Sequence, residues 1–407
     1  MSATKRETKM QKRLRIFGRE YRKLQELIEK YPNYPKKTAI LASGGETTVY
    51  DYIAIELAEV LLGLGCEVSF VYEGFRGATR GKARGGIEEI TNLKLDEMKI
   101  ESGGKIIKGC RGYNSFNFRG KDYSDITADN LKEFDVIFVI GGDGSMAHAS
   151  EYVEKYQNKV KFIGLIGTMD GAAATNVTHG RISTNKAILA EIKASAASAE
   201  SLSRYSVVEC MGRFCGEPAA EAAKLYIQEG GKVAAVLTPQ AQYDINKVAQ
   251  AVKENMGMVI VSEGIDMKNN TFLDEKQGYH KQISGAANYI AKELKKILDI
   301  PANRIDELSV IDVKGTVTGY TQRAGSIEYD DILNADYHIF QAVKFAITGR
   351  VNVVIVEGAN SYAIPINTFV SLNQKAEKTL EIKYHPEMRR VLKELRDVHG
   401  VYVGDFK

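Results

Sequence analysis

Short apolar runs rich in β-branched residues alternate with helix-like stretches along most of this chain. The runs span residues 38–42, 67–72, 135–140, 161–166, 205–209, 233–236, 258–262, 308–316 and 352–356. Strands that alternate with helices form βαβ units and hence parallel sheets. We therefore expect an α/β protein with two lobes, each a parallel-rich sheet flanked by helices.

Length, charge and cysteine spacing restrict the remaining choices. A chain of 407 residues fits two or three domains. A formal net charge of +3 argues against a polycation that binds nucleic acid. The N-terminus is polar, no apolar run approaches the ~20 residues of a membrane span, and the four cysteines form no C-x-x-C pair. We expect a cytoplasmic protein without membrane or nucleic-acid partners, and without a disulfide framework or zinc site.

Two segments outside the alternating pattern also favour helices. Residues 5–31 carry apolar side chains at helical spacing and are followed by Pro32 and Pro35. The basic face of this helix is compatible with nucleic acid or a membrane, but we favour packing against the body of the protein. The Ala- and Ser-rich segment 193–201 resembles a linker, and we favour a helix that continues from Lys186.

Three of the expected strands end in small, turn-forming residues, at 42–46, 140–145 and 166–171. In an open parallel sheet, ligands bind beyond the carboxyl ends of the strands. Glycines there allow backbone N–H groups to approach an anion, and a following helix N-terminus favours negative charge. A single turn of this kind also fits a plain strand-to-helix connection, so the argument depends on the polar residues that accompany the glycines.

Two aspartates in these loops indicate phosphoryl-transfer chemistry. Asp143 would repel a bare phosphate, and its presence is explained if Mg²⁺ bridges it to the phosphates. Asp170 lies two residues after Thr168, where a general base for a hydroxyl group is useful.

Four arginines border glycine-rich turns or predicted strands, a setting that suits phosphate recognition. They are Arg111, Arg204, Arg213 and Arg323. Each alone also fits an ordinary surface ion pair.

Several short motifs occur in a fixed order along the chain. They are Ser43-Gly44-Gly45, Tyr72-Glu73-Gly74-Phe75-Arg76-Gly77, a Gly103-Gly104 segment ending Lys108-Gly109-Cys110-Arg111, Gly141-Gly142-Asp143-Gly144-Ser145, Met211-Gly212-Arg213-Phe214-Cys215-Gly216, Ser262-Glu263-Gly264 and Gly319-Tyr320-Thr321-Gln322-Arg323. In content and order they resemble the 6-phosphofructokinase family, from about Lys37 to about Ala346, roughly three-quarters of the chain. The resemblance implies two Rossmann-like lobes of the phosphofructokinase fold, an enzyme, and a homo-oligomer, either a dimer or a tetramer.

The resemblance also implies roles for individual residues. ATP and Mg²⁺ would be bound by Gly44, Tyr72, Arg111, Gly142, Asp143, Gly144 and Ser145, with Asp143 as the metal ligand. Asp170 would be the base, and Thr168 and Arg213 would act beside it. The sugar phosphate would be bound by Thr168, Asp170, Met211, Gly212, Arg213, Glu263, Tyr320 and Arg323, and by Arg204 and Lys314 reaching across a subunit interface.

Two glycines favour ATP as the donor. Pyrophosphate-dependent members of the family carry Asp at the position of Gly144 and Lys at the position of Gly167, whereas glycine leaves room for the α-phosphate and nucleoside. Lys314 and Tyr320 are more typical of the pyrophosphate-type, long-chain branch. We weight the glycines more because they would touch the donor.

One departure from the family pattern keeps alternatives open. The usual third loop has a second aspartate, and this chain has Ala172 there, followed by Ala173 and Ala174. The expected reaction is phosphorylation of fructose 6-phosphate to fructose 1,6-bisphosphate. The alternatives are a paralogue with another phosphorylated acceptor or with pyrophosphate as donor, and a weakly active regulatory or assembly homologue.

The expected domain borders follow from the same comparison. They are an N-terminal helical extension at 1–36, a phosphoryl-donor lobe at 37–182 rejoined by about 321–372, and a sugar-phosphate lobe at 183–320 rejoined by about 373–407.

Overall fold

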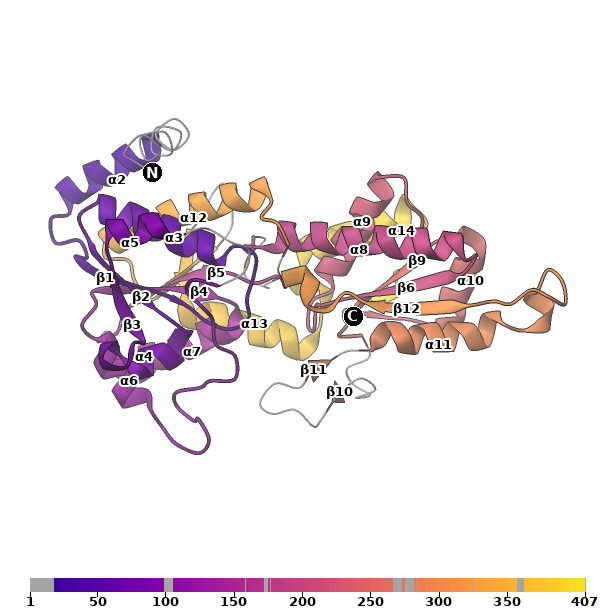
Figure 1. Cartoon of the computed structure of the whole chain (residues 1–407), viewed down its shortest axis with the longest axis horizontal. Helices are drawn as coiled ribbons and strands as arrows, with labels where there is room; N and C mark the ends of the chain where they lie inside the picture. The colour runs from indigo at the N-terminus through magenta and orange to yellow at the C-terminus, as the bar shows by residue number, and fades with distance from the viewer. Residues whose placement is uncertain are drawn as a thin grey trace. The chain divides into compact units, whose positions relative to one another are not determined.

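The structure is a computed structural model of the whole chain (Figure 1). It describes residues 18–98, 105–157, 159–171, 175, 177–265, 273–274, 282–283, 285–323, 325–356 and 362–406. Its contacts divide the chain into two compact units, and each unit is built from two stretches of sequence. Unit 1 contains residues 1–167 and 329–370, and unit 2 contains residues 168–328 and 371–407. These contact-based borders fall after residues 167, 328 and 370, and the sequence-based ones lie after 182 and after about 320 and 372.

Unit 1 is built on a seven-stranded sheet with the order β14-β13-β5-β4-β1-β2-β3. The strands are β1 (Lys37–Ala42), β2 (Glu67–Val71), β3 (Ile87–Ile90), β4 (Val136–Gly141), β5 (Phe162–Ile166), β13 (Val353–Val356) and β14 (Tyr362–Pro365). The inner neighbours pair in parallel, and only the edge strands β3 and β14 are antiparallel. Because β1, β4 and β5 are buried along nearly their whole length, they are continuous apolar runs rather than alternating ones.

Helices cover both faces of this sheet (Figure 1). One face carries α2 (Gly18–Lys30), α3 (Tyr50–Gly63) and α12 (Tyr329–Ile347), which pack on one another. The other face carries α4 (Gly74–Arg80), α6 (Ser124–Leu131) and α7 (Asp143–Tyr156). The remaining helical segments are η1 (Lys82–Arg84), α5 (Asn92–Glu97) and the start of α13 (Ile366–Thr379).

Unit 2 is built on a four-stranded parallel sheet with the order β12-β6-β9-β7. Its strands are β6 (Tyr205–Cys210), β7 (Val233–Leu237), β9 (Met258–Ser262) and β12 (Val313–Val317). Two small antiparallel pairs join β8 (Ala241–Gln242) to β15 (Asp405–Phe406), and β10 (Leu273–Asp274) to β11 (Gln282–Ile283).

Two apolar clusters form the core of unit 2, one on each face of its sheet. The first lies beneath α8 (Arg181–Ser201), α9 (Glu217–Gln228) and α14 (Pro386–Asp397). The second lies beneath α10 (Ile245–Asn255) and α11 (Ala286–Leu298) (Figure 1). Short 3₁₀ turns complete the unit: η3 (Pro301–Asn303), η4 (Gly319–Arg323) and η5 (Ile382–Tyr384).

The predicted α/β class, with parallel-rich sheets flanked by helices, is confirmed. Segment 193–201 is the second half of α8 and not a linker. Helix α2 covers the C-terminal part of the predicted N-terminal helix, and residues 5–17 lie outside the described residues. The strand expected at 308–316 begins only at Val313, so that part of the prediction is wrong. Within the described ranges, no helix is long and apolar enough to cross a bilayer.

Candidate active site

The glycine-rich loops of unit 1 lie together because β5, β4 and β1 are neighbouring parallel strands. Gly44 follows β1 with φ of +87°, a left-handed conformation that favours glycine. A Cβ atom on Gly44 would lie 3.2 Å from the Ser145 Oγ, and one on Gly141 would collide with Ser145. The first and second loops are therefore in direct contact at the carboxyl edge of the sheet.

The Arg111 side chain joins this group. Its guanidinium lies against Gly45, where it occupies the space that a Cβ would need. Gly109 lies against the carbonyl of Gly44, which brings the Arg111 turn onto the first loop. The structure thus brings together Gly44, Arg111 and Ser145 of the expected donor site. The Gly103-Gly104 motif lies outside the described residues.

A buried carboxylate, which the sequence analysis missed, holds this turn in place. Asp51 is fully buried in the first turn of α3 and accepts hydrogen bonds from the backbone N–H groups of residues 105, 106 and 107, at 2.9–3.2 Å. Such bonds to a charged acceptor are stronger than neutral ones. The sequence signal that could have revealed Asp51 is its position inside the apolar run Tyr50–Ala54. A charged side chain in such a run is buried and therefore requires polar partners.

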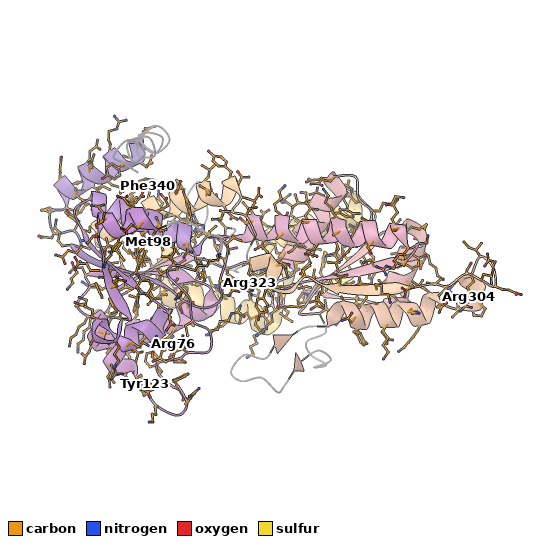
Figure 2. The ribbon with its side chains drawn as sticks, viewed as in Figure 1. Arg76, Met98, Tyr123, Arg304, Arg323 and Phe340 are labelled. Atoms are coloured by element: carbon orange, nitrogen blue, oxygen red, sulfur yellow. The ribbon has the colours of Figure 1, made fainter. Side chains whose placement is uncertain are left out.

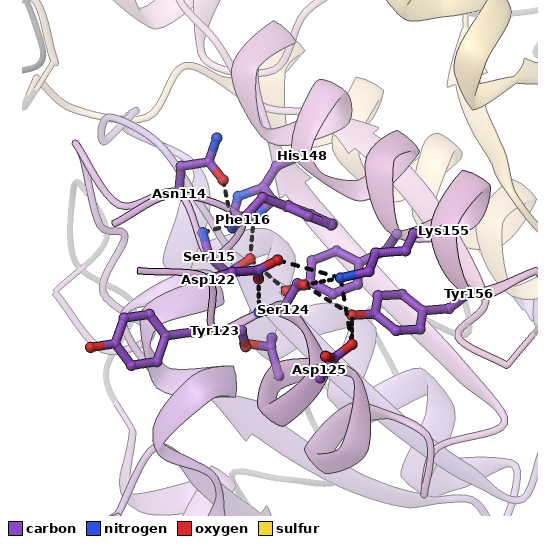
Figure 3. A network of polar contacts seen from close by, with 12 residues as sticks. Asn114, Ser115, Phe116, Asp122, Tyr123, Ser124, Asp125, His148, Lys155 and Tyr156 are labelled. Atoms are coloured by element: carbon purple, nitrogen blue, oxygen red, sulfur yellow. Dashed lines mark hydrogen bonds and ion pairs between the residues drawn. The ribbon is translucent and has the colours of Figure 1, made fainter. Parts of the chain in front are cut away.

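The segment that follows Arg111 is fastened to α7 by a polar network (Figure 3). The buried Ser115 hydroxyl contacts His148 Nε2 at 2.6 Å and the Tyr152 hydroxyl at 2.5 Å. Burial lowers the pKa of His148 to about 4, so its ring is neutral at pH 7. Lys155 donates to the Ser124 hydroxyl at 2.6 Å and thereby joins α7 to α6. Helix α7 therefore carries the second loop at its start and supports the Arg111 segment along its length.

Asp143 and Gly144 occupy the first turn of α7, which begins immediately after Gly142. A Cβ on Gly144 would meet no atom within 4 Å, so this exposed position is open. The described residues contain no group of three or more His, Cys, Asp or Glu side chains suited to a metal ion. A single carboxylate fits Mg²⁺ that takes its other ligands from phosphates and water. The residues present therefore fit Mg²⁺ that takes most of its ligands from a nucleotide and water.

Tyr72 follows β2 at the same edge of the sheet. Its hydroxyl donates to Glu88 Oε2 at 2.9 Å, and burial together with this carboxylate raises the pKa of Tyr72. The hydroxyl thus ties Tyr72 to Glu88 on the neighbouring strand β3.

In unit 2, Thr168 and Asp170 form a short turn. The backbone N–H of Asp170 donates to Thr168 Oγ1 at 3.2 Å, which fixes the two side chains relative to each other. Gly171 packs against the Glu217 carboxylate, which forms an ion pair with Arg181. Residues 172–174, the apolar continuation of this loop, lie outside the described residues.

The loop after β6, which carries Met211, Gly212 and Arg213, contacts the end of β9. The N–H of Gly212 donates to Glu263 Oε1 at 3.4 Å, and the N–H of Glu263 donates to the Cys210 carbonyl at 2.8 Å. Gly212 has φ of +137°, and a Cβ there would collide with the Cys215 carbonyl, so only glycine fits. On the other side of β6, Arg323 Nε approaches Met211 Sδ at 3.2 Å. Tyr320 on the same turn is 55% exposed.

Carboxylates gather around Arg213. Burial first, and then the charge of Asp170, raises the pKa of Glu263 to about 7, while Arg213 opposes this shift. Burial and the charge of Asp170 also raise the pKa of Glu377 on α13. The sequence analysis missed Glu377, because it lies in a lysine-rich helical stretch that resembles a solvated surface.

Arg204 and Lys314 do not lie with the other acceptor residues. Arg204 precedes β6, and Lys314 is the second residue of β12, so both are at the amino ends of strands whose carboxyl ends carry Arg213 and Arg323. Figure 2 shows this polarity on β12, with Arg323 beyond one end and Arg304 beyond the other. Three residue steps along β12 separate Lys314 from Val317 at the carboxyl end of the strand, a rise of about 10 Å. Arg204 bonds Ser198 at 2.8 Å, and Lys314 pairs with Asp312 at 3.4 Å.

Comparison with known proteins shows which protein family this arrangement belongs to. A sequence model described as Phosphofructokinase matches residues 37–346. The chain is 28% identical over 330 residues to a protein named ATP-dependent 6-phosphofructokinase 2 from Clostridium perfringens, covering 75% of this chain and 83% of that one. The fold resembles a Pichia pastoris phosphofructokinase (TM-score 0.69, 21% identity) over 88% of this chain and 40% of that longer chain.

A second solved structure carries a different donor in its name. A pyrophosphate-dependent phosphofructokinase from Nitrosospira multiformis matches with a TM-score of 0.62 and 20% identity, over 82% of this chain and 84% of that one. The solved structures show the fold, and the family match together with the named relatives indicates a phosphoryl-transfer enzyme. The chain belongs to the phosphofructokinase family, and it is a kinase of that family.

Proposed function

We propose that this protein transfers the γ-phosphoryl group of ATP to the hydroxyl of a sugar phosphate, with fructose 6-phosphate as acceptor and fructose 1,6-bisphosphate as product. The observation that carries the proposal is the cradle of Gly44, Gly45, Arg111 and Ser145 at the carboxyl edge of the unit 1 sheet. Close backbone approach at the glycines, a fixed guanidinium and the start of α7 together suit a polyphosphate.

Each residue then has a defined part in the reaction. Asp143 would hold Mg²⁺, which supplies charge neutralisation on the phosphates. Asp170 accepts the proton of the attacking hydroxyl, and Thr168, whose Oγ1 is fixed by the Asp170 N–H, orients the transferred group. Arg213 and Arg323 bind the anionic acceptor, and Glu263 accepts a hydrogen bond from a sugar hydroxyl. Gly142, Gly144 and Tyr72 border the donor, and Met211, Gly212 and Tyr320 border the acceptor.

Arg204 and Lys314 act on a neighbouring subunit in this proposal. They lie at the opposite strand ends from Arg213, so within unit 2 they cannot bind the same small molecule. Apolar side chains in the same part of unit 2 are highly exposed, with Ile305 at 95%, Leu308 at 90% and Val310 at 72%. Such exposure is typical of an interaction surface. A homo-oligomer with shared acceptor sites accounts for both observations.

Pyrophosphate is the second candidate donor. The open position at Gly144 favours ATP, because it leaves space where pyrophosphate-type relatives place a carboxylate. Lys314 and Tyr320 favour the pyrophosphate-type branch. The deciding experiment incubates purified protein and Mg²⁺ with ATP or pyrophosphate against a panel of sugar phosphates, with Asp170→Asn as the inactive control. Turnover with ATP and fructose 6-phosphate is expected.

Other outcomes assign the alternatives. Turnover only with another acceptor identifies a paralogue, and nucleotide binding without turnover identifies a regulatory homologue. Ala172→Asp restores the carboxylate usual in the family and should raise activity only if fructose 6-phosphate is the native acceptor. Gly171 should be left unchanged in that test, because a side chain there would displace the Glu217 carboxylate.

A further inference from the structure

The parallel ladder between β6 and β12 ends just before the residues assigned to the acceptor. Its last paired residues are Val317 and Glu209, and Thr318 then donates to the Glu209 carbonyl from both its N–H (3.1 Å) and its hydroxyl (2.8 Å). Beyond this point one strand continues into Met211 and the other into Gly319. The N–H of Met211 and the carbonyl of Gly319 therefore need partners other than the ladder.

The side chain of Gln322 supplies both partners. Its Oε1 accepts from the Met211 N–H at 3.1 Å, and its Nε2 donates to the Gly319 carbonyl at 3.0 Å. Its own carbonyl accepts from the Thr184 hydroxyl of α8 at 3.0 Å, and the residue is fully buried. Only one orientation of the amide satisfies both backbone groups. The amide thus takes the place of a peptide group where the two strands separate.

This bridge lies between the two loops that carry the cations of the acceptor site. Met211 begins the loop with Arg213, and Gln322 is the direct neighbour of Arg323. We propose that Gln322 is a positioning residue that sets the separation of the Arg213 and Arg323 loops and thereby the affinity for the phosphorylated acceptor. The proposal rests on the assignment of these loops to a sugar phosphate made above.

The first test replaces the amide with an isosteric apolar chain. Gln322→Met removes both hydrogen bonds, and we expect the KM for fructose 6-phosphate to rise by roughly 10–100-fold, because small displacements of binding groups are costly. The KM for ATP should stay within about twofold, since the donor cradle lies in unit 1. An unchanged acceptor KM in a folded variant overturns the proposal.

The Gln322→Glu variant tests the two hydrogen bonds through the pH dependence of its acceptor KM, which a purely structural role of the residue would not change. A protonated glutamic acid can accept from Met211 and donate to Gly319, as glutamine does, whereas the carboxylate can only accept. The acceptor KM of this variant should approach the wild-type value as the pH falls and rise as the carboxyl ionises, relative to wild type measured at each pH. A pH-independent difference between the two proteins contradicts the proposal.

A matched control exists in the same unit. Gln240 is equally buried and also makes two backbone bonds, accepting from the Gly216 N–H and donating to the Phe214 carbonyl, and both bonds go to the loop that carries Arg213. Each glutamine variant is then measured in wild type and in an Arg323→Ala background. The fold-change in acceptor KM caused by Gln240→Met should be the same in both backgrounds, whereas the fold-change caused by Gln322→Met should be largely lost once Arg323 is absent. If Gln322→Met also has the same effect on acceptor KM in both backgrounds, Gln322 does not act through Arg323 and the proposal is overturned.

Calorimetric titration of fructose 6-phosphate into each protein separates this inference from the proposed function. A wild-type protein that binds the sugar phosphate but transfers no phosphoryl group overturns the proposed reaction and leaves the Gln322 comparison intact. Equal dissociation constants for wild type and Gln322→Met overturn the inference alone. A wild-type protein that binds no sugar phosphate overturns both.

Discussion

The hydroxyl of Tyr50 donates to the carbonyl of Gly167 at 3.0 Å, and the Tyr50 ring fills the space that a side chain at residue 167 would need. The same hydroxyl lies 3.1 Å from the carbonyl of Ser43, so this ring joins the ends of β1 and β5. Glycine at 167 is therefore required by the packing of this protein, whichever donor it uses. Of the two glycines that favoured ATP as the donor, only Gly144 therefore still bears on the choice of donor.

Gly144→Asp should impair the use of ATP without unfolding the protein. The Cβ of an aspartate in the first turn of α7 would meet no atom within 4 Å, and its charge suits the helix dipole but repels the nucleotide phosphates. We expect the KM for ATP to rise by at least ~10-fold in initial-rate measurements. Gly144→Ala, which adds bulk without charge, should change it much less. Wild-type ATP kinetics in Gly144→Asp would show that this position does not select the donor.

Asp170→Asn should abolish turnover while nucleotide affinity stays near the wild-type value. A general base contributes roughly 10²–10⁴-fold to rate, and it acts on the transition state rather than on donor binding. The measurements are kcat and a nucleotide titration. A kcat near that of wild type removes Asp170 from the mechanism.

Glu263 should make stability fall as the pH rises towards neutrality. Its pKa in the folded protein is about 7 against an ordinary 4.5, so between these values the folded state binds more protons than the unfolded state. The free energy of unfolding should therefore lose about 3 kcal/mol from this group between pH 4.5 and 7. Urea unfolding across this range should show the loss in wild type and not in Glu263→Gln. Parallel profiles for the two proteins would contradict the shift.

The ion pair of Arg181 and Glu217 should matter for folding. Both side chains are largely buried, at 17% and 6% exposure, so removal of one partner leaves a charge that water cannot reach. Arg181→Met should cost about 3–5 kcal/mol in urea unfolding, and the double variant Arg181→Met with Glu217→Gln should recover much of it. A double variant no more stable than Arg181→Met would show that the cost comes from lost packing.

Mixing two inactive proteins tests the shared acceptor site. An Arg204→Ala subunit keeps its own Asp170, and an Asp170→Asn subunit keeps its Arg204, so a mixed interface contains one site with both groups intact. We expect partial recovery of activity after subunit exchange, as an assay of the mixture against each parent will show. No recovery after exchange verified by mass would mean that Arg204 serves its own chain.

The sequence predicted the strands well where burial on both faces makes them continuous apolar runs, as in β4 and β9. It also indicated the glycines whose backbone is in close contact, such as Gly44 and Gly212. It did not reveal Asp51 or the bridging role of Gln322, because both depend on backbone groups far away in sequence that only the folded chain brings near. The parallel pairing of β6 and β12 likewise places Arg204 and Lys314 at the strand ends away from Arg213. The order of motifs along the chain does not indicate this placement.

The division of each unit between two stretches of chain has a consequence for biosynthesis. Strand β13 pairs with β5, and α14 covers α9, yet more than 150 residues separate the members of each pair. A nascent chain that has emerged only to residue 328 has β5 without its outer neighbour and the α9 cluster without its cover. Each surface is open to aggregation until the segment that covers it, β13 or α14, has left the ribosome. Prematurely terminated chains should therefore accumulate as insoluble material and depend on chaperones, even when every active-site motif is present.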